Sequence, residues 1–142
     1  MSGISYFESR TGKVDCTSEE LFDFVTDIRH FEQFAPQGTI RNWHAEKESC
    51  TFSVSTVGTV NLRIKEKTAN KVVYNGDALK VNDFSLALNI SEGDGSSSEV
   101  KIELTADLNP ILKMMASKPI ARFLEILIVE MEKFSGWKDI RG

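Results

Sequence analysis

Apolar and polar residues alternate with a period of two through the middle of the chain, from Ile40 to Leu108. Successive side chains of a strand point to opposite faces, so this alternation predicts antiparallel strands with one buried and one wet face. The alternation is clearest in residues 84–91 and 100–108. Between these runs, the polar and glycine-rich residues 92–98 predict a hairpin loop. We expect about six consecutive strands in this region.

Two of these runs do not show which of their sides is buried. A β-bulge in the first run would let residues of both alternating sets point inward. Every assignment of a site residue depends on how these two runs face. The alternatives for residues 40–46 are Ile40, Asn42 and His44 on the inner side, or Trp43 and Ala45. The alternatives for residues 71–77 are Val72 and Tyr74 on the inner side, or Val73.

A short strand and a capped helix precede this region. Thr17 followed three residues later by Glu20 has the form of a capping box, and apolar residues then recur at helical spacing. We expect this helix to end near Asp27. A second short helical segment covers residues 29–35 and stops before Pro36, because proline disfavours the helical conformation of the residue before it.

One long helix follows the strands, from Ile111 to about Trp137, with Asn109 as its N-cap. Pro119 lies inside the helical pattern and is expected to kink the helix or to split it, with Ser117 capping a second segment. A curved antiparallel sheet with a long helix across it leaves a space that only large side chains would fill. The order of elements therefore predicts a container for a ligand.

Composition and charge narrow the class of protein. With 142 residues, 41% of them hydrophobic and 27% charged, the chain is expected to form one globular domain over residues 1–142. Its 17 basic and 21 acidic residues give a net charge of −4, which argues against nucleic-acid binding and against electrostatic docking on anionic membranes. The two cysteines do not make a disulfide framework, no secretory signal is visible, and no stretch is long and apolar enough to span a bilayer. We therefore expect a cytoplasmic protein without membrane insertion.

Three segments of the sequence together resemble a known family. They are the strand and capped helix of residues 14–27, the second helix and proline of residues 31–36, and the long helix from Asn109 to Phe134. With the strands between them they span nearly the whole chain, which resembles the START-like superfamily, also called SRPBCC or Bet v 1-like. Within it, the chain is similar to the small polyketide cyclase/dehydrase-type proteins. The resemblance implies an α+β helix-grip fold, in which a curved antiparallel sheet of about seven strands wraps around the long helix.

The resemblance implies several functions, because the superfamily includes lipid carriers, plant-hormone binders, cyclases and co-chaperones. Our leading hypothesis is binding or transport of a small hydrophobic ligand in a cavity between the sheet and the C-terminal helix, without chemistry. One alternative is a polyketide cyclase/dehydratase-like enzyme that uses the same cavity, and another is a co-chaperone-like module that binds a partner protein. Ile126, Val129 and Trp137 are apolar where the long helix should face water, which suggests a homodimer contact.

Few residues are candidates for catalysis or metal binding. The two histidines and two cysteines have no metal-ligand spacing, and there is no nucleophile motif, so we expect no metal and no cofactor. His44 and Glu46 are two residues apart on a predicted strand and share a face. If that face lines the cavity, His44 could transfer protons while Glu46 orients it, and Tyr74 is a further weak candidate. If the face is wet, His44 and Glu46 are an ordinary surface pair.

Candidates for ligand binding are the residues expected near the space under the long helix. Large or flexible apolar side chains such as Met114 and Met115 suit an adaptable pocket and an ordinary core equally well. A ligand that buries ~300 Å² gains roughly 7 kcal/mol, and association costs on the order of 4–15 kcal/mol. Tight binding would therefore require polar contacts, for which Asn42, His44 and Tyr74 are the candidates. The predicted ligand-binding residues are Asn42, Trp43, His44, Phe52, Val54, Leu62, Tyr74, Phe84, Leu86, Met115, Phe123 and Leu127.

Overall fold

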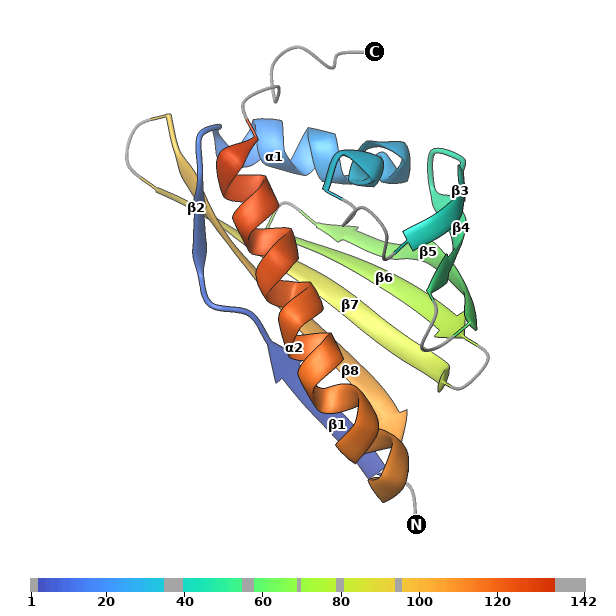
Figure 1. Ribbon diagram of the computed structural model, residues 1–142. Helices are drawn as coiled ribbons and strands as arrows, with labels where there is room; N and C mark the ends of the chain where they lie inside the picture. Colours follow the sequence, from blue (N-terminus) through green and yellow to red (C-terminus); the bar gives the residue numbers. More distant parts are fainter. Residues whose placement is uncertain are drawn as a thin grey trace.

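An antiparallel sheet forms one layer of the protein, and helical segments cover part of its inner side (Figure 1). The computed structural model describes residues 3–34, 40–54, 58–68, 70–78, 81–93 and 96–134. Neighbouring strands follow the order β1-β8-β7-β6-β5-β4-β3, and the short β2 also pairs with β8. The strands are β1 (Gly3–Glu8), β2 (Gly12–Val14), β3 (Ile40–Ala45), β4 (Ser49–Val54), β5 (Gly58–Thr68), β6 (Lys71–Ala78), β7 (Val81–Glu92) and β8 (Ser98–Leu108).

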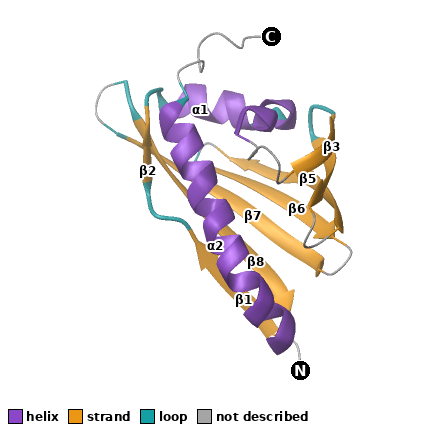
Figure 2. Ribbon diagram, in the orientation of Figure 1, coloured by secondary structure: helices purple, strands orange, loops and turns teal. Residues whose placement is uncertain are grey.

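The helical segments are α1 (Ser18–Val25), the 3₁₀ helix η1 (Ile28–Phe34) and α2 (Pro110–Lys133). Figure 2 shows them on the same side of the sheet. Helix α1 packs on β6, β7 and β8, η1 packs on β3 and β4, and α2 packs on β1, β2 and β8. The predicted order of elements is confirmed, except that the predicted first strand is two short strands, β1 and β2, which pair in turn with β8.

The capping box predicted at the start of α1 is confirmed. The Glu20 backbone N–H donates to Thr17 Oγ1 at 3.1 Å, and the Thr17 N–H donates to Glu20 Oε1 at 2.9 Å. The helix ends at Val25, slightly before the predicted end near Asp27, and Thr26 is its C-cap. The second helical segment is also present as η1, although the predicted stop at Ala35 and Pro36 lies outside the described residues.

Register across the sheet places the inner-facing residues in rows. One row crosses β4 to β8 and includes Gly76, which lies between Leu62 on one side and Phe84 on the other. A Cβ atom added to Gly76 would lie 2.5 Å from Phe84 Cζ and 2.7 Å from the Asn61 carbonyl oxygen. The Phe84 ring therefore lies directly over the Gly76 backbone, and only a glycine leaves room for it there.

Helix α2 is a single helix from Pro110 to Lys133, so of the two outcomes expected at Pro119, a kink or a split, the split does not occur. Asn109 caps its start as predicted, accepting a hydrogen bond from the Leu112 N–H at 2.8 Å. The Ser117 hydroxyl does not cap a second segment but donates to the Lys113 carbonyl at 2.5 Å. Pro119 is exposed, so water can satisfy the carbonyl one turn earlier that lacks its usual N–H partner.

The end of α2 also differs from the prediction, because Phe134 is already the extended C-cap and the helix does not reach Trp137. No helix among the described residues has the length and apolarity needed to cross a membrane. The second half of α2 is anchored in the core, whereas no residue of the first half is fully buried. The buried residues of α2 are Leu124, Leu127, Ile128 and Met131.

Candidate functional site

The inner side of the sheet carries apolar side chains that the helices leave partly exposed. These residues pack against the core, yet each stays half-buried. Helix α2 adds half-buried residues from the side of residues 112–123 that packs on the core. We call this set the inner apolar face. It consists of Trp43, Leu62, Ile64 and Phe84 from the sheet and Leu112, Ile120 and Phe123 from α2.

A β-bulge brings Trp43 onto the inner apolar face. The register of β3 and β4 shifts between Arg41 and His44, and Asn42 has a φ of 56° in the left-handed region, which asparagine tolerates better than most residues. Because of the extra residue, both Ile40 and Trp43 turn toward the core, as the predicted bulge allowed. The Trp43 ring then stacks on Phe52 of β4, with ring centroids 5.6 Å apart.

The same bulge places the polar residues of this strand on the outside. Asn42, His44 and Glu46 are all exposed, so of the two alternatives for this run, the one with Asn42 and His44 on the inner side is not the one adopted. His44 and Glu46 thus form part of a wet strand face. To contact a ligand or to transfer a proton, His44 and Glu46 would have to act from outside the inner apolar face.

Tyr74 is fully buried on the inner side of β6, which settles the facing of the second ambiguous run. Its hydroxyl donates a hydrogen bond to the Val25 carbonyl at 2.7 Å, and its ring meets Phe31 edge-on with centroids 5.4 Å apart. Burial and the neighbouring Cys50 raise the pKa of Tyr74 well above its usual value. The hydroxyl is therefore protonated and engaged with the end of α1.

Cys50 is the other polarisable group beneath the inner apolar face. It is buried on β4, opposite Leu62 of β5, and burial raises the pKa of its thiol to about 12. A thiol with such a pKa stays protonated and unreactive near neutral pH. Among the described residues, no group of three histidine, cysteine, aspartate or glutamate side chains is placed to hold a metal ion.

The remaining predicted residues fall into five groups. Phe52, Leu86 and Leu127 are buried in the core, and Leu62, Phe84 and Phe123 are part of the inner apolar face. The expectation that Met114 and Met115 lie near the space under the helix is wrong, because both are exposed on α2. Ile126 and Val129 are half-buried. The side chain of Val54 and the whole of Trp137 lie outside the described part of the structure.

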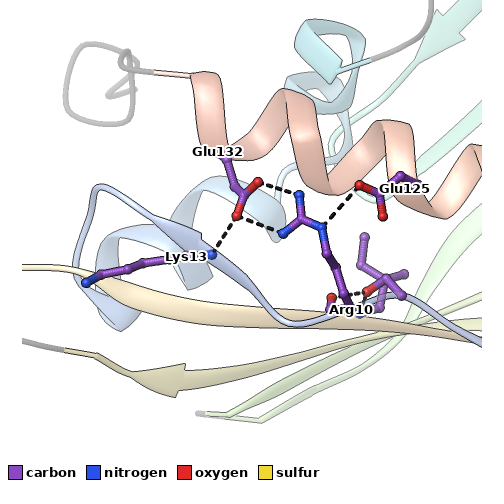
Figure 3. A network of polar contacts seen from close by, with 6 residues as sticks. Arg10, Lys13, Glu125 and Glu132 are labelled. Atoms are coloured by element: carbon purple, nitrogen blue, oxygen red, sulfur yellow. Dashed lines mark hydrogen bonds and ion pairs between the residues drawn. The ribbon is translucent and has the colours of Figure 1, made fainter.

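An ion-pair cluster fixes the second half of α2 to the chain between β1 and β2 (Figure 3). Arg10 Nη2 lies 2.6 Å from Glu132 Oε1, Arg10 Nη1 lies 3.0 Å from Glu132 Oε2, and Arg10 Nε lies 3.1 Å from Glu125 Oε2. The Lys13 backbone N–H also donates to Glu132 at 3.1 Å. Hydrogen bonds from Arg10 lower the pKa of Glu132 below its usual value. No prediction from the sequence included this cluster, although the seven-residue spacing of Glu125 and Glu132 places them on one side of a helix.

Comparisons with known proteins place this architecture among solved structures. The sequence matches no protein-family model, and no curated protein shows significant similarity to it. The structure is similar to protein XoxI from Bacillus cereus, with a TM-score of 0.72 and 10% identity over 91% of this chain and 94% of that chain. It is also similar to a START superfamily protein from Mycobacterium smegmatis, with a TM-score of 0.65 and 14% identity over 94% of this chain and 100% of that chain.

A plant enzyme structure has the same arrangement of elements. Truncated norcoclaurine synthase from Thalictrum flavum has a TM-score of 0.68 and 6% identity over 94% of this chain and 97% of that chain. The chain has the helix-grip fold of START and Bet v 1-like proteins. This helix-grip chain is thus α+β, with an antiparallel sheet, a short N-terminal helix and a long C-terminal helix, as the sequence predicted. At these identities the likeness concerns the fold alone.

Proposed function

We propose that the protein binds a small, largely apolar molecule on the inner apolar face, between the sheet and the first half of α2. The observation that supports this proposal is the partial exposure of inward-facing residues such as Trp43, Leu62 and Phe84. In a fully packed core such side chains would be buried, since burying a large apolar side chain contributes roughly 1.5–3 kcal/mol. A ligand that covers them would recover part of that free energy.

The surroundings favour an apolar ligand over a polar one. Tyr74 uses its hydroxyl on the Val25 carbonyl, and Cys50 is buried and protonated, so neither is free to recognise a charged group. Hydrophobic burial would then supply most of the affinity. Because association itself costs on the order of 4–15 kcal/mol, we expect moderate rather than very tight binding.

Binding without chemistry is better supported than the enzyme hypothesis. A cyclase-like mechanism using His44 would need that side chain to face the ligand, whereas His44 is exposed on the outer side of β3. The solved structures with this fold include norcoclaurine synthase and a di-domain ARO/CYC protein, BexL, so the fold itself is compatible with catalysis. The partner-module hypothesis and a dimer through Ile126, Val129 and Trp137 stay predictions.

The test has two steps, and the first is native mass spectrometry of the intact protein, followed by denaturation and analysis of any released small molecule. The second step is titration with the apolar probe anilinonaphthalene sulfonate, read by fluorescence. Leu62→Gln places a polar group on the inner apolar face and should weaken probe binding several-fold. Lys65→Gln on the exposed side of the same strand is the control and should leave binding unchanged. Equal affinities of the wild type and Leu62→Gln would contradict the proposal.

A further inference from the structure

The first half of α2 exposes large apolar side chains on its outer side. Ile111 is 68% exposed, Met114 is 76% exposed and Met115 is 65% exposed. These residues lie on the side of the helix that faces away from the half-buried Leu112 and Ile120. Exposed apolar side chains that cluster on one element mark a contact surface more often than isolated ones do.

Basic residues continue this exposed side toward the middle of the helix. Lys118 and Arg122 follow Ile111 and Met115 at helical spacing, so these residues form one stripe along the helix. Both are exposed, and no ion pair joins either of them to a carboxylate within the described residues. We call this surface the outer stripe; it consists of Ile111, Met114, Met115, Lys118 and Arg122.

Acidic side chains are absent from the outer stripe. From Pro110 to Phe123 the helix contains no aspartate or glutamate, and the next carboxylate, Glu125, is held by Arg10. Asp107 of β8 precedes the start of the helix by three residues, and it points to the opposite side of the sheet, because its neighbours in the strand are buried inward. The outer stripe is therefore basic and apolar, although the net charge of the whole chain is −4.

We propose that the outer stripe docks the protein on the surface of a bilayer that contains anionic lipids. Ile111, Met114 and Met115 would enter the boundary between headgroups and acyl chains, and Lys118 and Arg122 would contact the anionic headgroups. The charge pattern favours a bilayer over a second copy of this chain. A two-fold dimer would bring the same patch of both copies together and oppose their basic residues without carboxylates to compensate.

This inference does not depend on the proposed ligand, because the docking surface lies on the outer side of α2. The test is flotation of the intact protein with vesicles of phosphatidylcholine alone and of phosphatidylcholine mixed with phosphatidylglycerol. The wild type should float only with the anionic vesicles, and less at high salt, because salt screens the attraction. Lys118→Glu with Arg122→Glu should weaken binding by more than about thirtyfold, which is the expected loss for removing two cations near an anionic surface.

Two further variants separate the outer stripe from charge in general. Arg63→Glu with Lys65→Glu makes the same change in net charge on the exposed side of β5 and should bind as the wild type does. Met114→Gln with Met115→Gln keeps the charge and should lose binding at both low and high salt. The proposal is overturned if the wild type stays with the unbound fraction, or if the β5 variant loses as much as the α2 variant. It is also overturned if sedimentation shows a dimer that the methionine variant dissociates.

Discussion

The buried hydroxyl of Tyr74 offers the sharpest test of how the inner side of the sheet is built. Tyr74→Phe removes the hydroxyl and keeps the ring, so the edge-on contact with Phe31 at 5.4 Å is preserved. The hydrogen bond lost is the one to the Val25 carbonyl at 2.7 Å. Val25 is in the last turn of α1, where carbonyl groups have no partner within the helix. The variant therefore leaves a buried acceptor unpaired.

The expected cost follows from the burial of that acceptor. An unpaired buried polar group destabilises a protein by about 1–3 kcal/mol. For 142 residues, at about 2.1 cal/mol/K per residue, the entropy of unfolding is about 300 cal/mol/K. A loss of ~2 kcal/mol then lowers the melting temperature by about 7 °C. Urea denaturation and thermal unfolding, both followed by circular dichroism, measure the two quantities independently.

The chain contains a matched control, because its second tyrosine, Tyr6, is exposed. The Tyr6 hydroxyl bonds Glu8 and Glu103 at the surface, where water replaces the lost contacts, so Tyr6→Phe should leave the melting temperature unchanged. The reasoning fails if Tyr74→Phe is no less stable than Tyr6→Phe. If Tyr74→Phe is stable but loses affinity for anilinonaphthalene sulfonate, the Tyr74 hydroxyl contacts the ligand, which is the role predicted for it from the sequence.

Three other variants test separate features of the fold. Because burial raises the pKa of Cys50 to about 12, the folded protein keeps a proton that the unfolded chain releases near pH 9. The stability of the wild type should therefore fall as the pH rises from 9 to 12, and that of Cys50→Ala should fall less. Equal slopes of stability against pH in the two proteins would contradict this. Gly76→Ala should cost about 1–3 kcal/mol in urea denaturation, since its Cβ would overlap the Phe84 ring, and an unchanged midpoint would refute the proposed packing. Arg10→Gln should lower the melting temperature, because it leaves Glu132 without its cation. The decrease should be smaller at high salt, which screens the ion pair in the wild type. A decrease that salt does not reduce would argue that the ion pair is not its cause.

Local sequence patterns were sufficient to predict the elements for which the sequence allows only one interpretation. The capping box at Thr17 and Glu20 depends on two side chains three residues apart, so it could be predicted without tertiary contacts. The long alternating runs of β7 and β8 pair in the register that places their apolar residues on one face. In both cases the short-range pattern and the final environment agree.

The strand β3 shows where the period-two rule stops. A simple alternation cannot place Ile40 and Trp43 on the same face, and the sequence does not reveal that one residue is left over. The extra residue is accommodated by a left-handed conformation at Asn42, whose preference for it is too weak to identify a bulge in advance. As a result, two of the predicted polar contacts, Asn42 and His44, are exposed instead of facing the inside.

Helix α2 shows a second limit, which concerns extent rather than period. A hydrophobic pattern tells which residues share a side of a helix, but not how far the sheet reaches beneath them. The second half of α2 rests on the core, where Leu124, Leu127, Ile128 and Met131 are buried. Along the first half, Leu112 and Ile120 are left half-covered, and Met114 and Met115 are exposed on the other side. Apolar residues at both kinds of position are costly for folding alone, so a ligand on one side and a bilayer on the other would each give them a function that the fold does not require.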